Sequence, residues 1–184
     1  MTYVAFLRGI NVGGNSIVSM ASIKGALVDL GLSDVRTYIN SGNVIFSTRA
    51  SDAQKLGARI EKALEGRTGM PIKVLVMDHK DLKKLVDAIP RNWVDDKTMR
   101  TYVLLLWKEL DDGKILERLP VRPGVDNVRY APGAVIWQVD RKDIPKSRMS
   151  KMVGAPYYKQ ITMRSANTMR KLNELTAASR AASG

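Results

Sequence analysis

The sequence predicts an α+β protein built from two ferredoxin-like (α/β-plait) βαββαβ halves, each followed by an added C-terminal helix. Three observations support this. Strand-like and helix-like segments follow the order strand, helix, strand, strand, helix, strand, and the order occurs twice. In each occurrence the two middle strands are separated only by a short turn, and a further helix-like segment follows the last strand.

The first half begins with an apolar, β-branched strand that stops at Gly9. Ser19 is a suitable N-cap for the helix that follows, which closes at Gly31. Ser41 and Gly42 form the hairpin turn, Ser51 caps the second helix, and Asp78 caps an extra helix that ends before Pro90. We expect strands at 2–9, 34–40, 43–48 and 72–77, and helices at 19–31, 51–66 and 78–89.

The second half repeats the order with a hairpin turn at 131–133. We expect strands at 100–107, 125–130, 134–139 and 160–164, a short helix at 111–119, a helix beginning at 145–153, and a last helix capped by Ser165. Turn-forming residues at 91–99 predict two domains, 1–90 and 91–184. The similar order indicates duplication of the architecture, although chance recurrence of common elements is the alternative.

Composition limits the chemistry. The 184 residues include no cysteine and one histidine, His79, which argues against thiolate metal sites, disulfides and a cysteine nucleophile. We therefore expect no metal and no cofactor, and no catalytic residue can be assigned. No apolar run is long enough to span a membrane and no export signal is evident, so we expect a cytoplasmic protein without membrane contact.

Charge favours an anionic partner. Thirty Lys and Arg against 18 Asp and Glu give a net charge of +12. Segment 141–171 contains nine cations, Arg148 and Arg164 among them, and one acid, Asp143. Such a segment is usually a solvated face, but its imbalance favours an anion-binding surface. Within it, Tyr157 and Tyr158 next to Lys159 could stack on bases, although the RNP1 motif of RNA-recognition domains is absent.

Two polar clusters are candidate binding sites in the first half. The loop after the first strand carries Arg8, Asn11 and Asn15 between glycines, and could present donors to an anion near a helix N-terminus. Its alternative, which we favour, is a tight glycine turn stabilised by asparagines. The hairpin adds Arg36, Asn40 and Asn43, and in a βαββαβ sheet the first strand lies beside the third, so Arg8, Arg36 and Asn40 could converge. An ordinary Asx-type turn explains Asn40 and Asn43 equally well.

A third cluster lies where the last strand meets the last helix. Arg164 and Asn167 could face a phosphate or carboxylate there, or Ser165 could simply cap the helix while Arg164 is solvated. Both interpretations stay open.

The motifs RGINVGG at 8–14 and VRTYINSGNVIF at 35–46 resemble those of the conserved bacterial proteins called domain of unknown function 1697. The resemblance continues at 146–149, which is similar to the family's SK[LF] segment, and at 162–172, where the family's usual Asn and Trp are replaced by Ser165 and Ala166. It implies a pair of α/β-plait domains and no particular activity.

Two functions follow as hypotheses. The first is non-enzymatic binding of a phosphorylated or polyanionic ligand, a nucleotide or nucleic acid, through Arg8, Arg36, Arg148, Arg164 and the basic segment. The alternative is a metal-independent enzyme that acts on a small anionic substrate between the two halves. The oligomeric state is not predicted.

Overall fold

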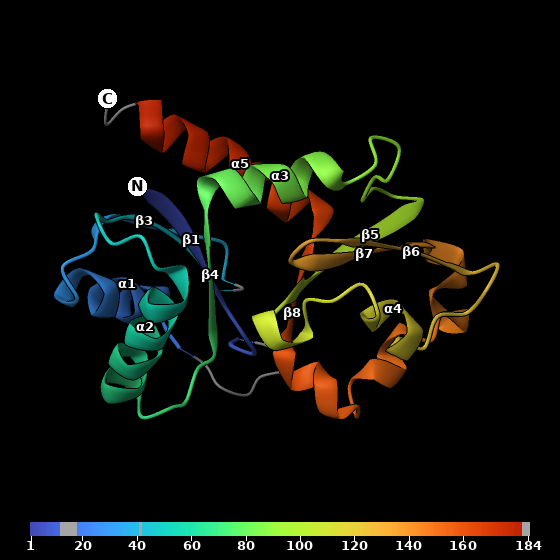
Figure 1. The fold of residues 1–184 in the computed structure, drawn as a ribbon, viewed down its shortest axis with the longest axis horizontal. Coiled ribbons are helices and arrows are strands. Elements are labelled where there is room, and N and C mark those ends of the chain that lie inside the picture. Colours follow the sequence, from blue (N-terminus) through green and yellow to red (C-terminus); the bar gives the residue numbers. More distant parts are fainter. Residues whose placement is uncertain (12–17, 41, 182–184) are drawn as a thin grey trace. The chain divides into compact units, whose positions relative to one another are not determined.

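Two four-stranded antiparallel sheets form the framework of the protein, as the sequence predicts (Figure 1). They are seen in a computed structural model that describes residues 1–11, 18–40 and 42–181. The chain divides into two compact units, Met1–Leu82 with Leu172–Gly184, and Lys83–Lys171. Each unit contains one sheet. The expected domain division at residues 90 and 91 stays a prediction.

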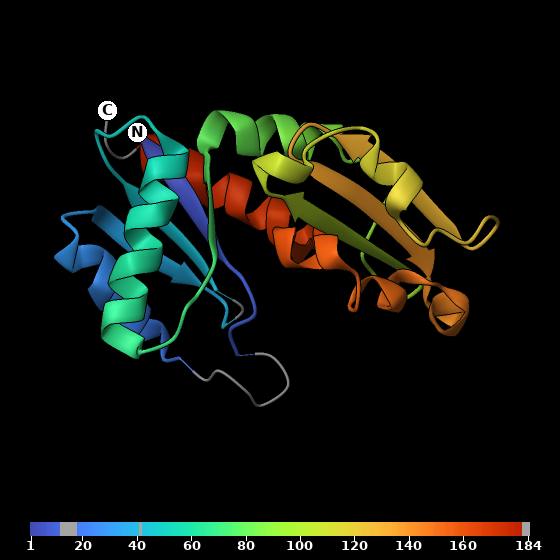
Figure 2. The ribbon, with the colours of Figure 1, turned by 60° about the horizontal axis from the view of Figure 1, so that its bottom comes forward.

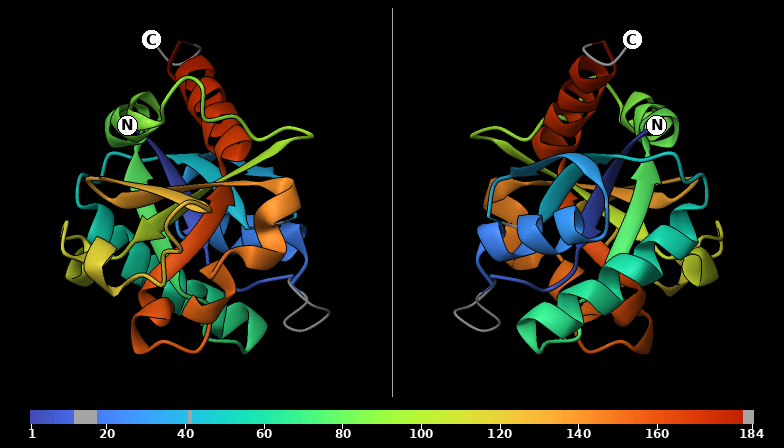
Figure 3. Two further views of the ribbon diagram at one scale, coloured as in Figure 1. Left: turned by 90° about the vertical axis from the view of Figure 1, so that its right-hand side faces the viewer. Right: turned by 90° about the vertical axis from the view of Figure 1, so that its left-hand side faces the viewer.

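The first unit has the strand order β2-β3-β1-β4, with every neighbouring pair antiparallel. Its strands are β1 (Thr2–Leu7), β2 (Ser33–Tyr38), β3 (Asn43–Ser47) and β4 (Val74–Asp78). Two helices, α1 (Met20–Asp29) and α2 (Ala53–Thr68), cover one face of this sheet (Figures 2 and 3). The extra helix α3 (His79–Ala88) follows β4 directly.

Caps explain where these helices begin. Ser19 caps α1 by accepting a hydrogen bond from Ser22 N at 3.0 Å, as predicted. Asp52, not the expected Ser51, caps α2, because its carboxylate accepts from Lys55 N at 2.9 Å, the third residue of the helix. The buried stripe of α2, which includes Ile60 and Leu64, packs on the sheet and stabilises the helix.

The hairpin of the first unit depends on Gly42. Its φ is +78°, in the left-handed region, and a Cβ atom added there would lie 2.8 Å from Leu7 Cβ. Leu7 N also donates to Gly42 O at 2.8 Å. The turn therefore lies tightly against the end of β1, and only glycine fits without strain.

The second unit repeats the strand order as β6-β7-β5-β8. Its strands are β5 (Met99–Leu106), β6 (Asp126–Ala131), β7 (Ala134–Asp140) and β8 (Ile161–Ser165). Ser165 caps α5 (Ala166–Ala181) through a hydrogen bond from Thr168 N at 3.1 Å, as predicted. Trp137 is fully buried beneath the crossovers, with Leu104 and Val135 beside it.

The crossovers of this unit differ from the expected helices. In place of one helix at 111–119 there are a short 3₁₀ helix, η1 (Lys108–Leu110), and one turn of α-helix, α4 (Ile115–Arg118). In place of a helix from 145 there are three 3₁₀ helices, η2 (Arg141–Lys146), η3 (Met149–Met152) and η4 (Pro156–Gln160). Pro145, Gly154 and Pro156 interrupt this stretch too often for α-helical hydrogen bonds to propagate. None of the helices in the described ranges is long and apolar enough to cross a membrane.

Candidate functional site

A pocket of about 210 Å³ lies in the second unit, on the sheet face that also carries Trp137. Strands provide its floor and the 3₁₀ helices between β7 and β8 provide its walls, so the whole site belongs to one unit. The lining residues are Tyr102, Val139 and Met163 from the strands, and Ile144, Ser147, Met149, Ser150, Met152, Val153 and Tyr158 from the crossover.

The lining is largely apolar and open to solvent. At its edge, Ile144 and Val153 are 41% and 62% exposed, which is unusual for side chains of this kind. Three methionines adapt their shape readily to an irregular ligand, and two tyrosines offer ring surface. Ser147 and Ser150 supply hydroxyl groups. This combination suits a small ligand with an apolar or flat part.

Asp126 connects the pocket wall to the sheet. Its carboxylate is buried and accepts hydrogen bonds from Trp137 Nε1 at 3.0 Å, Arg122 N at 2.9 Å and Arg148 N at 3.4 Å. The Arg122 guanidinium donates in turn to Lys146 O at 3.2 Å. Polar contacts to residues 146–148 thus hold the wall in a stretch that has no α-helix of its own.

The nine cations of segment 141–171 have different environments. Lys142 pairs with Asp140 at 3.0 Å and Lys146 with Asp143 at 2.7 Å. Lys171 is exposed, and the Arg170 guanidinium donates to Trp93 O at 3.1 Å. Three exposed cations form no ion pair within the described ranges, namely Arg148, Lys151 and Lys159. These three alternate in sequence with pocket residues, since Arg148 and Lys151 each lie between two lining residues and Lys159 follows Tyr158.

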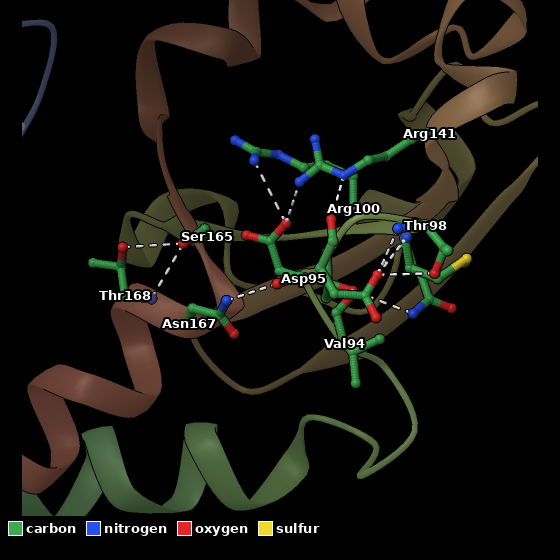
Figure 4. A network of polar contacts seen from close by, with 12 residues as sticks. Val94, Asp95, Thr98, Arg100, Arg141, Ser165, Asn167 and Thr168 are labelled. Atoms are coloured by element: carbon green, nitrogen blue, oxygen red, sulfur yellow. Dashed lines mark hydrogen bonds and ion pairs between the residues drawn. The ribbon is translucent and has the colours of Figure 1, made fainter.

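Arg141 belongs to a separate network that holds the segment before β5 (Figure 4). Asp95, whose side chain is 6% exposed, accepts from Arg141 at 3.1 Å and Arg100 at 3.5 Å. Asn167 Nδ2 donates to Asp95 O at 2.7 Å. The backbone N–H groups of Met99 and Thr98 donate to the Asp96 carboxylate and lower its pKa.

Arg164 is buried rather than solvated. Its guanidinium donates to Thr162 Oγ1 at 3.1 Å and Met163 O at 2.8 Å, and burial lowers its pKa to about 10. By strand alternation it lies on the sheet face opposite Trp137, since Val103 is its partner on β5 while Tyr102 pairs with Trp137. The predicted cluster of Arg164 with Asn167 therefore does not reach the pocket.

In the first unit, the side chains of Asn11 and Asn43 form hydrogen bonds with backbone groups. Asn11, at φ +55°, donates to Val18 O at 3.1 Å and Asn40 O at 3.0 Å, and accepts from Val18 N at 2.9 Å. Asn43 is fully buried and donates to Tyr38 O at 3.1 Å. These contacts match the structural alternative for both residues.

Arg8 and Arg36, the two arginines of the first unit predicted to bind a ligand, make contacts in different parts of that unit. Arg8 follows β1 at the end where Asn11 and Asn40 meet, and its N–H donates to Lys73 O at 2.8 Å. Arg36 reaches α5, where its guanidinium donates to Ser179 Oγ at 2.8 Å. Asn15 falls outside the described residues. As ligand-binding residues, Arg8, Arg36 and the asparagines stay predictions.

Comparison with known proteins defines the family. The family model described as protein of unknown function (DUF1697) matches residues 1–137. The chain belongs to the DUF1697 family. A solved structure, that of conserved bacterial protein SP0830 from Streptococcus pneumoniae, has a TM-score of 0.80 and 26% identity over 95% of this chain and 98% of that chain. No curated protein matches the chain.

For this DUF1697 chain, sequence reasoning located the basic segment but missed the pocket within it. The one indication of the pocket in the sequence is that Met149, Met152 and Tyr158 lie among the cations of this segment. Without the strand register, nothing in that spacing indicates that Tyr102 and Met163 complete the same cavity.

Proposed function

We propose that the protein binds, without chemical turnover, a phosphorylated ligand of the nucleotide or nucleic-acid class at the pocket of the second unit. The apolar part of the ligand occupies the cavity, and its phosphates contact the exposed cations Arg148, Lys151 and Lys159. The observation that carries the proposal is that three exposed cations, which form no ion pair within the described ranges, directly neighbour in sequence the residues that line an open apolar pocket.

The ring and the phosphates of such a ligand each have suitable side chains to contact. Methionine and tyrosine side chains accept a flat ring through dispersion and stacking contacts. Arginine and lysine bind phosphate through charge-assisted hydrogen bonds, and the net charge of +12 attracts polyanions over longer distances. The hydroxyl groups of Ser147 and Ser150 line the pocket, and a hydroxyl that already accepts a hydrogen bond, as Ser147 Oγ does from Met149 N at 3.2 Å, still has an O–H to donate to a polar atom of the ring.

The test is a salt-dependent titration. Wild type and a triple variant, Arg148→Ala with Lys151→Ala and Lys159→Ala, are titrated with labelled oligonucleotides and with nucleotides at about 50 and 200 mM salt. We expect wild-type affinity to fall steeply with salt and the triple variant to show a flatter slope, because fewer counterions are released.

A matched control removes three exposed cations from helices of the first unit, Lys24→Ala, Arg59→Ala and Lys62→Ala. This control has the same net charge as the test variant, so general electrostatics would weaken both equally. Equal weakening, or no binding of nucleotide or oligonucleotide to wild type, would contradict the proposal. A chemical change in the nucleotide, followed by NMR, would contradict its non-enzymatic part.

A further inference from the structure

We infer that the pocket receives one unpaired base of a single-stranded nucleic acid, with Tyr158 as its stacking residue. The inference rests on the proposed function and narrows its ligand class. It depends on three observations, which are the size of the cavity, the different environments of the two adjacent tyrosines, and the distribution of the exposed cations.

The size of the cavity limits the ligand. At about 210 Å³ it is below the range of roughly 300–1,000 Å³ that is typical for pockets holding drug-sized ligands. The volume therefore suits a single ring system. Because the cavity is open and its edge carries the exposed side chains of Ile144 and Val153, the rest of the ligand can continue outside it.

The two adjacent tyrosines have separate roles. Tyr157 packs under Arg118, whose guanidinium lies 5.1 Å from the ring centroid, and its hydroxyl donates to Arg118 O at 3.2 Å. Tyr158 lines the pocket, as do the strand residues Tyr102 and Met163, whereas Tyr157 is not among the lining residues. Of this pair, only Tyr158 is placed to contact a ring in the cavity.

The exposed cations favour a single-stranded nucleic acid as the ligand over a molecule with one phosphate group. Lys151 belongs to η3 and Lys159 to η4, and both of these 3₁₀ helices supply lining residues to the pocket. Phosphates that precede and follow the inserted base can therefore each meet a cation. A duplex does not fit this arrangement, because its bases are paired and stacked and extruding one costs a few kcal/mol.

The experiment compares strands of equal charge with and without bases. Fluorescence anisotropy with wild-type protein measures affinity for a short single strand, for an abasic strand of the same length, and for the duplex. Stacking of one base is worth about 1–3 kcal/mol, so we expect the base-bearing strand to bind about 5- to 150-fold more tightly than the abasic strand. The duplex is expected to bind more weakly than the single strand.

Two variants assign the effect to a residue. Tyr158→Leu should remove most of the advantage of the base-bearing strand and leave the affinity for the abasic strand unchanged. Tyr157→Leu is the matched control and should keep the advantage. Circular dichroism and melting temperature establish folding, and if Tyr158→Leu fails to fold, the wild-type comparison of the base-bearing and abasic strands decides alone.

The outcomes separate this inference from the proposed function. Equal affinity for base-bearing and abasic strands, with a salt-dependent slope that Arg148, Lys151 and Lys159 control, would overturn base insertion and leave polyanion binding intact. Binding of free nucleotides but of no strand would overturn the single-strand assignment alone. Absence of all binding would overturn both.

Discussion

The two sheets share one strand order, yet the segments that connect their strands differ in kind. In the first unit the crossovers are α-helices of 10 and 16 residues, whose buried stripes cover one face of the sheet. In the second unit the corresponding crossovers are a four-residue α-helix and a series of 3₁₀ helices. Arg148 N donates to the Asp126 carboxylate and the Arg122 guanidinium donates to Lys146 O, and these two hydrogen bonds attach the second of these crossovers to the rest of the unit.

The difference shows that a crossover helix also fills the space above the sheet, in addition to connecting two strands. An α-helix fills the space above a sheet with side chains at regular spacing, and so leaves little room for a ligand. The 3₁₀ helices of the second unit cover Trp137 but leave a methionine-lined cavity beside it. The pocket therefore arises where regular helical packing is interrupted.

The largest effect is expected from Ile60→Ala in α2. Ile60 is fully buried, so its truncation should lower the free energy of unfolding by about 2–5 kcal/mol. Met152→Ala in η3 should cost less, because this site adjoins an existing cavity and its surroundings can relax. Urea denaturation followed by circular dichroism measures both. A larger loss for Met152→Ala would contradict the view that the first unit is the more tightly packed of the two.

An intermediate effect is expected from Asp126→Ala. This change leaves Trp137 Nε1 buried without its acceptor and releases the wall at Arg148, at a cost of about 1–3 kcal/mol. Tryptophan emission should change as well.

The control for that prediction is Asp143→Ala. It removes only a pair with the exposed Lys146, which is worth about 0–1 kcal/mol. If the two variants were equally stable, Asp126 would not be the residue that holds the wall.

The smallest effects on stability are expected from removing the charge of a single carboxylate, as in Asp96→Asn, and they should depend on pH. Backbone N–H donors lower the pKa of Asp96 in the folded state, so the charged carboxylate stabilises the fold above its unfolded pKa of about 3.9. That stabilisation is lost as the pH falls through the lower folded pKa. Asp96→Asn should therefore be less stable than wild type at neutral pH, and the difference should shrink as the pH falls through the lowered folded pKa of Asp96.

The first unit offers a counterpart at Asp52, whose pKa is lowered chiefly by the backbone N–H of Lys55. Asp52→Asn should show a smaller difference at neutral pH, because asparagine is itself a good N-cap. Thermal melts across a pH series measure both. A gap for Asp96→Asn that does not change with pH would indicate that the carboxylate charge is not the cause.

Much of the first unit could be predicted from local sequence. Ser19 and Asp78 begin helices, Gly42 permits the hairpin, and alternating apolar residues mark the strands. Such signals act within a few residues and do not depend on the rest of the chain. The same reasoning failed for the helix expected from residue 145, where Pro145, Gly154 and Pro156 interrupt the helical pattern and three 3₁₀ helices form.

By itself, the sequence determined the α+β class, the repeated strand order and the position of the basic segment, because these follow from residue spacing and composition. Only the tertiary structure decided that Arg141 pairs with Asp95, because the two residues lie 46 positions apart along the chain. It also decided the pocket, whose floor and walls come from strands and turns far apart in sequence. Contacts between residues far apart in sequence depend on how the sheet and its crossovers pack, and this packing cannot be predicted from patterns within a few residues.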